Sequence, residues 1–302
     1  MIINKLDNIQ FRLNEAHDFP WLKKYGTAFC AFDETGSGCI SIGMKDGEKK
    51  YFCKIAGANT IEGELSPMES IAMLKNAVNI YVDLQHPHLI KLIEHYAHGP
   101  FYVAVFEWTD GECLYDHWNF SKYAQDPTIQ SPGDRFKKLS VEKRLAAVEV
   151  LFSFMELTAS KGYVAVDLYD GSILYDFDTD RTMICDIDFF KKAPVYNDRG
   201  ADWFGSKRLK APEEYVQGAC IDEATNVFTL GALIFEFFGN FSRADIIKRY
   251  EDSCFYPCGS EQWQLDEGRY LCARRAVSHR RQDRYQTISE FRAAWQEFSP
   301  RE

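Results

Sequence analysis

The sequence predicts an α+β protein, with a β-rich N-terminal part that contains one main helix and a helical C-terminal part. Short apolar runs with strand-like alternation dominate before residue 110, and apolar residues at helical spacing dominate after residue 140. The polar stretch Ser121–Lys138, which contains Pro127, Pro132 and Gly133, separates the two patterns and is predicted to be a surface loop. Two lobes of this kind are expected to bind a ligand in the cleft between them.

The first strands are predicted from alternation and turn residues. Apolar side chains alternate along Ile40–Met44, and Asp46-Gly47 then marks a hairpin turn. The partner strand is predicted over Lys50–Ala56, and Phe101–Trp108 is another strongly β-prone run. These runs predict an antiparallel sheet in the N-terminal part.

One helix interrupts these strands. Ser66-Pro67-Met68-Glu69 is a capping box with proline at the first helical position, which is a strong helix start signal. Apolar residues then recur on one helical face as far as Leu84. The main helix of the N-terminal part is therefore predicted from Pro67 to Leu84.

Helical patterns dominate the C-terminal part. Val141–Ser160 carries apolar residues at helical spacing. Two short strands, Ser172–Phe177 and Thr182–Asp186, follow around an acidic turn. The pattern from Asp222 onward is mainly helical and ends with a helix over Ile288–Phe298.

Composition and charge exclude several classes of protein. The 302 residues are 46% hydrophobic, which suffices for a sizeable core. A net charge of −10 without a basic stripe argues against nucleic-acid binding. Met1–Asp18 contains no secretory apolar region, and the apolar run Phe228–Gly239 is too short to span a bilayer. The expectation is a cytoplasmic protein that does not bind membranes, with nine reduced cysteines.

Three charged residues carry the candidate chemistry. Phosphoryl transfer needs a cation on the phosphates, carboxylates that hold Mg²⁺ and a carboxylate near the attacking hydroxyl. Lys54 lies in a strand downstream of a turn with Gly36 and Gly38, where backbone N–H groups can approach phosphate. Asp167 precedes a short strand and Asp186 ends the next one, so their carboxylates are expected to converge. Taken singly, each has an ordinary interpretation as a solvated strand lysine or a turn aspartate.

The order of these motifs resembles that of the eukaryotic-type (Hanks-type) Ser/Thr protein kinases over roughly Phe29–Phe298. The matching segments are, in chain order, the glycine turn with Lys54, Leu84–Leu92, Val105–Gly111, Asp167-Leu168, Asp186, Gly205–Glu213, Asn226–Gly231 and Gln282–Tyr285. The resemblance implies the bilobal protein-kinase fold, with residues 1–25 as an N-terminal extension, 26–109 as the N-lobe and 110–302 as the C-lobe. It also implies that Arg284 is the buried partner of Glu213, in Ala211-Pro212-Glu213.

The resemblance further implies a role for each matched residue. Lys54 would contact the α- and β-phosphates of ATP, Asp186 would hold Mg²⁺ (or Mn²⁺), and Asp167 would accept the proton of a protein Ser/Thr hydroxyl. Ser206 stands where the family has a threonine that supports the catalytic aspartate, which favours Ser/Thr over Tyr as the acceptor. The nucleotide would be met by Gly36, Gly38, Ile40, Phe52, Phe106 (the gatekeeper), Glu107, Trp108 and Thr109.

The sequence departs from the family around the catalytic aspartate. Ala165-Val166 replaces His-Arg, which argues against control by activation-loop phosphorylation, and Tyr169 replaces the family's lysine. Ser172, a weaker oxygen ligand, replaces the asparagine that binds a second Mg²⁺. Asp188 replaces the glycine of Asp-Phe-Gly. Either it shares a strand face with Asp186 and serves as an oxygen donor, or it is an exposed turn carboxylate.

Two further departures concern the nucleotide pocket. Phe52 is expected to face the same way as Lys54, where the family has a small alanine above the adenine, so it would crowd that space. The main helix has Ala77 where the family has a glutamate that pairs with the lysine. Glu64 and Glu69 are possible substitutes, although Glu69 already serves the capping box.

Three functions are therefore considered. A divergent, weakly active Ser/Thr protein kinase is favoured by the retention of Lys54, Asp167 and Asp186. A pseudokinase that acts as a nucleotide- or protein-binding module is favoured by the altered residues around them. A small-molecule kinase of the aminoglycoside-phosphotransferase type is disfavoured, because that class generally lacks counterparts of Glu213 and Arg284.

Overall fold

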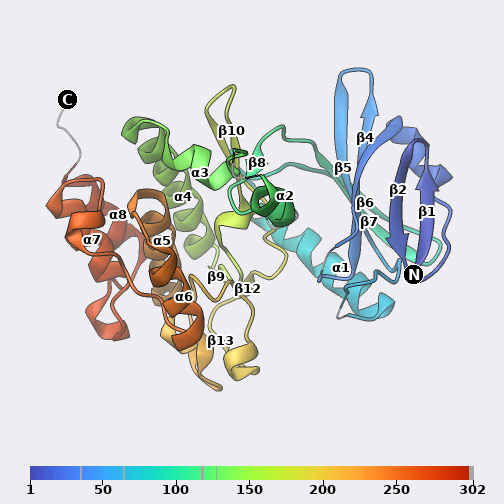
Figure 1. Cartoon of the computed structure of the whole chain (residues 1–302). Helices are drawn as coiled ribbons and strands as arrows, with labels where there is room; N and C mark the ends of the chain where they lie inside the picture. Colours follow the sequence, from blue (N-terminus) through green and yellow to red (C-terminus); the bar gives the residue numbers. More distant parts are fainter. Residues whose placement is uncertain (35, 64, 117–118, 127, 299–302) are drawn as a thin grey trace. The chain divides into compact units, whose positions relative to one another are not determined.

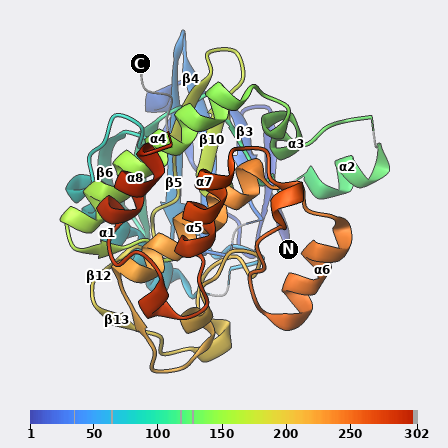
Figure 2. The ribbon, with the colours of Figure 1, turned by 90° about the vertical axis from the view of Figure 1, so that its left-hand side faces the viewer.

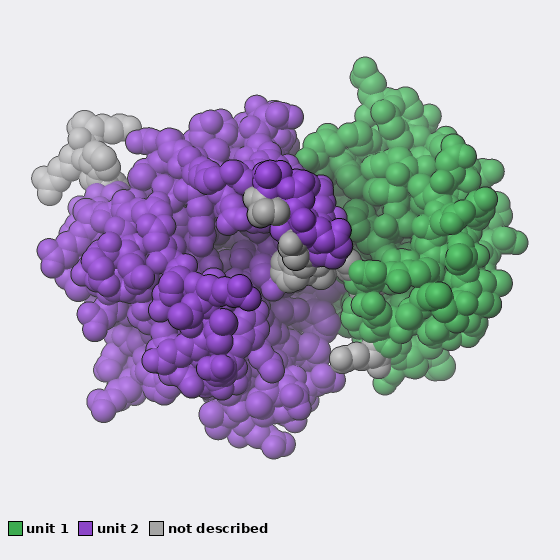
Figure 3. Space-filling model, in the orientation of Figure 1, with its two compact units in different colours: residues 1–110 green, residues 111–302 purple. Residues whose placement is uncertain are grey.

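The computed structural model describes residues 1–302 with the exception of 35, 64, 117–118, 127 and 299–302. The chain forms two compact units, Met1–Asp110 and Gly111–Glu302 (Figures 1 and 3). The first unit is rich in strands and has one long helix, and the second is mainly helical, so the predicted α+β class is confirmed. The described residues include no helix that combines the length and the apolar character needed to span a bilayer.

The first unit is built on a five-stranded antiparallel sheet with the strand order β3-β4-β5-β7-β6 (Figure 1). The predicted hairpin is present, because Asp46 pairs with Lys49 across a turn in which Gly47 has a φ of +59°. The strands are β3 (Thr27–Phe32), β4 (Cys39–Asp46), β5 (Lys49–Ala56), β6 (Leu92–His98) and β7 (Phe101–Glu107).

Helix α1 (Pro67–Asp83) packs against β5, β6 and β7. Its predicted capping box is formed: the Ser66 hydroxyl accepts the Glu69 N–H at 3.3 Å, and the Glu69 carboxylate accepts the Ser66 N–H at 2.9 Å. The ring of Tyr81 lies edge-on to Phe106 of β7, with 4.8 Å between the ring centroids. The helix therefore covers the sheet face that carries Phe106.

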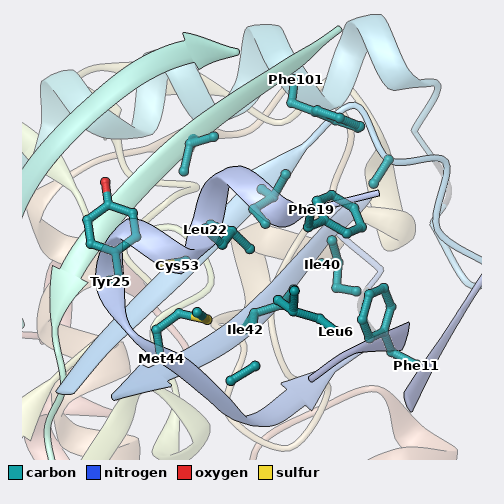
Figure 4. Packing of buried hydrophobic residues seen from close by; sticks show 14 of the residues in the cluster. Leu6, Phe11, Phe19, Leu22, Tyr25, Ile40, Ile42, Met44, Cys53 and Phe101 are labelled. Carbon is teal, nitrogen blue, oxygen red and sulfur yellow. The ribbon is translucent and has the colours of Figure 1, made fainter. Parts of the chain in front are cut away.

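The N-terminal residues cover the opposite face of the sheet. They form a hairpin of β1 (Ile2–Leu6) and β2 (Ile9–Leu13), followed by the 3₁₀ helix η1 (Pro20–Tyr25). Their buried side chains and alternate residues of the sheet make one core (Figure 4). Its members include Leu6, Phe11, Leu13, Phe19, Leu22 and Tyr25 from the N-terminal residues and Ile40, Ile42, Met44, Cys53, Ile55, Val103 and Val105 from the sheet.

The second unit is organised around helix α5 (Glu223–Phe238), which is buried along nearly its whole length. Helices α4 (Val141–Ser160), α7 (Glu267–Ala276) and α8 (Ile288–Gln296) pack against it (Figure 2). The remaining helices and strands are β8 (Glu112–Cys113), α2 (Phe120–Gln125), α3 (Pro132–Lys137), β9 (Tyr163–Val164), β10 (Ile173–Asp176), β11 (Arg181–Ile184), β12 (Lys191–Lys192), β13 (Val195–Tyr196), β14 (Cys220–Ile221) and α6 (Arg243–Asp252).

The predicted loop Ser121–Lys138 is wrong in part, because most of α2 and all of α3 lie within it. Ser131 caps α3 by accepting the Asp134 N–H at 3.2 Å, and Pro132 takes the first helical position. Phe136 is buried and packs against aromatic residues of β10 and α5. Proline and glycine indicated a loop here, whereas the serine-proline pair starts a helix, as it does in α1.

Candidate functional site

Lys54 lies on the sheet face of the first unit that α1 covers. Its side chain is buried, with 9% of its surface exposed, and the register places Ser41 and Ala104 on either side of it. Phe52 lies two residues away on the same strand and pairs with Phe106. Lys54 is thus a buried residue on the same sheet face as Phe52 and Phe106.

Aromatic rings gather beside Lys54. The ring centroid of Phe52 lies 6.1 Å from that of Phe32 and 6.3 Å from those of Phe106 and Trp108. The ring centroids of Phe29 and Trp108 are 4.8 Å apart. Both rings pack on β4, since a Cβ at Gly43 would lie 2.8 Å from the ring of Phe29 and 3.0 Å from that of Trp108. Rings thus occupy the part of this face where the family resemblance would put the adenine.

Ile40 does not join this group. It is fully buried in the core shared with the N-terminal residues, and strand alternation turns it away from the face of Lys54. The sequence prediction that its side chain meets the nucleotide is wrong, because the glycine turn enters β4 one residue out of register with that expectation. The residues of β4 that share the face of Lys54 are Ser41 and Gly43.

The residues expected to follow the gatekeeper lie at the end of β7. The backbone N–H of Glu107 donates to the Lys91 carbonyl at 2.9 Å, and that of Trp108 donates to the Lys50 carbonyl at 3.2 Å. The indole N–H of Trp108 donates to Asp110 at 3.0 Å. Two backbone donors near the expected adenine site are thus already used inside the first unit. Thr109 is partly buried.

The two glycines of the predicted phosphate turn differ in what they require. Gly38 has a φ of +70°, and a Cβ there would lie 3.0 Å from the Cβ of Ser70 in α1. A Cβ at Gly36 would meet no atom within 4 Å, so that position tolerates a side chain. Gly38 is therefore the position where glycine is structurally required.

Helix α1 offers no carboxylate on its buried face. Its buried residues are Ser70, Leu74, Ala77, Val78, Ile80 and Tyr81, and Glu69 is exposed in the capping box. Glu64, the other candidate partner of Lys54, lies outside the described residues. The family's ion pair between this helix and the strand lysine is thus not formed from α1.

Asp167 and Asp186 share an unusual backbone conformation in the second unit. Asp167 has a φ of +64° and Asp186 a φ of +53°, in the left-handed region that non-glycine residues rarely adopt. The side-chain oxygen of Asn226 in α5 accepts the Ala165 N–H at 2.8 Å and thereby anchors the loop before Asp167. Four described residues elsewhere, Asp7, Asn59, Asp180 and Ser253, also have a positive φ, so this conformation points to a functional site only together with the electrostatic coupling of Asp167 and Asp186.

The electrostatics indicate that these carboxylates lie near each other. Burial raises the pKa of Asp167 to about 7; the negative charge of Asp186 acts in the same direction, and the positive charge of Lys210 opposes them. The charges of Asp186 and Lys210 thus act on Asp167 in opposite directions, and perturbed pKa values of this kind are frequent at acid–base sites.

Ser172 connects the loops of the two aspartates. Its carbonyl accepts the Cys185 N–H at 2.9 Å, which places it one residue away from Asp186. The Ser172 hydroxyl is buried and has no hydrogen-bond partner among the residues that the structure describes. An oxygen in this position suits a hard cation held together with the Asp186 carboxylate.

Asp188 fits neither of the two expectations. It is buried, so it is not an exposed turn carboxylate. Strand β11 ends at Ile184, so Asp188 and Asp186 do not share a strand face. The strand is shorter than predicted because the chain turns at Asp186, where φ becomes positive.

Lys210 and Tyr169 were missed by the sequence reasoning as members of this site. The buried Lys210 ammonium donates to the carbonyls of Ala201 at 3.1 Å and Trp203 at 2.7 Å. Burial is the main cause that raises the pKa of the Tyr169 hydroxyl, and the charges of Asp167 and Asp186 add to it. The only indication of Lys210 in the sequence was its position directly before Ala211-Pro212-Glu213, and this position does not reveal which residues it interacts with.

The segment that contains Lys210 is firmly held. The carbonyl of Ser206 accepts the N–H groups of Leu209 at 2.8 Å and Lys210 at 3.1 Å. Arg284, which is buried, donates to both oxygens of Glu213, at 2.7 and 2.9 Å. This bidentate pair fixes the end of the segment.

Asp170 is engaged elsewhere. It accepts a hydrogen bond from Arg208 at 2.6 Å, and Arg208 lies 3.7 Å from Glu236. A pocket of about 140 Å³ borders Asp170, Glu236 and Tyr115. That volume is below the several hundred Å³ of a nucleotide site.

The described residues contain no group of three or more His, Cys, Asp or Glu side chains arranged to hold a metal ion. Mg²⁺ at a nucleotide needs only one or two carboxylates, because phosphates and water complete its shell. Comparisons with protein-family models and with curated proteins found no match to this chain.

Proposed function

We propose that this chain is a divergent member of the protein-kinase-like superfamily, with its bilobal fold, and that it transfers the γ-phosphoryl group of ATP to a protein Ser/Thr hydroxyl. The observation that carries the proposal is the grouping of Asp167, Asp186 and Lys210, with both aspartates in a left-handed backbone. The order of motifs from Lys54 to Arg284 supports the same assignment.

Each residue has a defined part in the proposed reaction. Asp167 accepts the proton of the substrate hydroxyl. The hydroxyl oxygen forms a bond to the γ-phosphorus of ATP, while the bond between the γ-phosphorus and the bridging oxygen breaks and ADP leaves. Asp186 and the Ser172 hydroxyl would hold Mg²⁺, which would supply positive charge to the phosphates when it is bound. Lys54 contacts the α- and β-phosphates.

Lys210 is proposed to supply the positive charge that the family's catalytic-loop lysine provides. Tyr169 stands at that loop position, and its neutral hydroxyl cannot supply the positive charge of the family's lysine. Lys210 acts electrostatically on Asp167 from a different place in the chain.

One observation favours a second function, that of a pseudokinase. The rings of Phe29, Phe32, Phe52 and Trp108 crowd the sheet face beside Lys54. If these rings stay in place, adenine has no room there and the protein serves as a binding module. The Glu213–Arg284 pair supports a protein kinase rather than a small-molecule kinase, because it fixes the segment that faces a protein substrate in the resembling family.

The decisive experiment measures transfer of labelled phosphate from ATP with Mg²⁺ or Mn²⁺. The variant is Asp167→Asn, because asparagine tolerates the left-handed backbone and removes only the charge. We expect a loss of about 10²–10⁴-fold relative to the unaltered protein. The matched control is Asp180→Asn in the β10–β11 turn, where φ is +54° and the residue is exposed, and it should retain full activity.

The outcomes separate the candidate functions. Equal incorporation by the protein and by Asp167→Asn would contradict the role of Asp167. No incorporation together with no rise in melting temperature on adding MgATP would favour the pseudokinase. A mass-spectrometric map of autophosphorylated Ser or Thr residues would support a protein kinase over a small-molecule kinase.

A further inference from the structure

The segment between β3 and β4, of which the structure describes residues 33–34 and 36–38 and which is here named the glycine turn, is bound at its start by the N-terminal hairpin. Arg12 of β2 donates to the Asp33 carboxylate from its backbone N–H at 2.6 Å, from Nε at 3.0 Å and from Nη2 at 3.1 Å. Nη2 also donates to the carboxylate of Glu34. One arginine thus engages both acidic residues at the start of the turn.

We propose that Arg12 is a positioning residue: it fixes the glycine turn and neutralises Asp33 and Glu34, so that the turn accepts phosphate. The clamp itself stands on contacts within the first unit, and its effect on nucleotide rests on the proposed function.

The hairpin is a rigid support for Arg12. Its neighbours in β2, Phe11 and Leu13, are almost fully buried in the core of the first unit. Phe11 lies close to Ile40, which follows the glycine turn in β4 (Figure 4). The hairpin therefore holds the turn at its start through Arg12 and just beyond its end through Phe11.

The same N-terminal residues also support the turn from the other side. The backbone N–H of Asn14 donates to the Asn59 carbonyl at 3.0 Å, and its amide donates to the Thr60 carbonyl at 3.1 Å. Asn59 and Thr60 belong to the segment that follows β5. This segment contacts the glycine turn, because a Cβ at Gly63 would lie 2.9 Å from the Cα of Gly38. Both flanks of the turn are thus tied to residues 12–14.

The charges explain why this site needs an arginine. Asp33 stands where the resembling family has a glycine, and Glu34 follows it, so two carboxylates enter a turn meant for an anion. Burial opposes ionisation of Asp33, but the hydrogen bonds from Arg12 outweigh it and hold the Asp33 pKa below its usual value. The Asp33 carboxylate is therefore charged at neutral pH, and the Arg12 guanidinium, which hydrogen-bonds to both Asp33 and Glu34, offsets the repulsion of phosphate. A turn that is already ordered before phosphate binds also loses less conformational entropy on binding.

The clamp is tested by amide hydrogen exchange in peptides that cover Phe32–Ile40. Arg12→Gln removes the side-chain bonds and keeps the backbone bond, and the guanidinium is partly exposed, so we expect exchange to accelerate roughly three- to tenfold. The control is Lys23→Gln, which removes a charge paired with Asp7 in the same region and should leave this exchange unchanged. Equal exchange in Arg12→Gln and the unaltered protein overturns the clamp.

Amide exchange in peptides from β7 distinguishes a general folding defect from a local loss of the clamp. If these also exchange faster in Arg12→Gln, the measurement is made on Arg12→Lys, which keeps the charge and loses the two-pronged geometry. Acceleration confined to the turn supports the clamp, and its absence overturns it.

The neutralising role is tested by the kinetics of ATP use. Arg12→Gln should raise KM for ATP about three- to tenfold and leave kcat within about twofold, because binding rather than chemistry is affected. Asp33→Asn in the same protein should recover most of the loss, which a merely structural role would not do. If the unaltered protein does not bind MgATP, the proposed function fails, while the exchange experiment still decides the clamp.

Discussion

Asp167 and Asp186 each hold a conformation that costs an ordinary residue about 1–2 kcal/mol. The surrounding structure enforces it through Asn226 before one aspartate and the Ser172–Cys185 hydrogen bond before the other. At the scale of single residues, stability is therefore lower at this site than an unstrained chain would allow. The proposed function accounts for this strain, because both aspartates take part in the proposed reaction.

A neighbouring residue, Glu214, makes stability depend on pH. Burial raises the pKa of Glu214 to about 8 even though the Ala211 N–H, at 2.7 Å, favours the charged form. The folded chain then keeps a proton that the unfolded chain releases above its ordinary pKa of 4.5, so the free energy of unfolding falls as pH rises from about 4.5 to about 8. Glu214→Gln keeps an acceptor for Ala211 and should be more stable than the unaltered protein at pH 8, by up to roughly 4 kcal/mol.

Denaturant unfolding at pH 5 and pH 8 measures this difference. The exposed Glu251→Gln serves as the control and should follow the unaltered protein at both values. Parallel pH profiles for Glu214→Gln and the unaltered protein would contradict the assignment.

Some candidate residues stand out in the sequence and others do not, for a physical reason. Lys54, Asp167 and Asp186 stand in local motifs whose order is informative. Lys210 and Glu214 acquire their environment from burial and from residues distant in the chain, so no local pattern marks them. The side chain of Ile40 was misplaced because a shift of one residue in a strand reverses its face.

At the scale of secondary-structure elements, helix packing leaves little free space. Helices α5 and α7 approach closely at Gly231, where a Cβ would lie 2.8 Å from the Cβ of Ala276 and 2.9 Å from Val277. The helix Val141–Ser160, which has clear periodicity, was predicted with both ends correct, whereas the helices predicted over Pro67–Leu84 and Ile288–Phe298 end earlier, at Asp83 and Gln296. Helices α2 and α3 were not, because each has only six residues and gives no periodic signal.

Gly231→Ala tests this packing. Alanine favours a helix over glycine by about 1 kcal/mol, whereas overpacking a core costs about 1–3 kcal/mol. The two contacts below 3 Å make overpacking the larger effect, so we expect a loss of about 1–2 kcal/mol in the free energy of unfolding. The double variant with Ala276→Gly moves the methyl group across the contact and should recover part of the loss. A Gly231→Ala protein as stable as the original would show that the helices separate without cost.

At the scale of the whole molecule, each unit has its own core. The core of the first unit includes Leu6, Phe11 and Leu13 of the hairpin, so residues 1–25 are part of that unit's structure. Nothing in the sequence motifs required this, because the resemblance begins only near Phe29. The apolar side chains Phe11 and Leu13 were the available signal.

Deletion of residues 1–25 should expose one face of the sheet, including Ile42, Met44 and Val105. We expect strong binding of a hydrophobic dye and fast amide exchange in β4, with α5 still protected because its packing lies within the second unit. Ile3→Ser, at a position 65% exposed in the same hairpin, should change neither readout. A truncated protein that keeps β4 protected and binds no dye would refute this view.

The contiguity of the first unit has a consequence for synthesis on the ribosome. All residues of its core lie within the first 110 of the chain, so that core can close before most of the second unit has been translated. At roughly 5–20 residues per second, residues 111–302 take on the order of ten seconds or longer to be translated. Because the hairpin and the sheet are both complete by residue 110, the hairpin can cover the apolar face of the sheet during that interval.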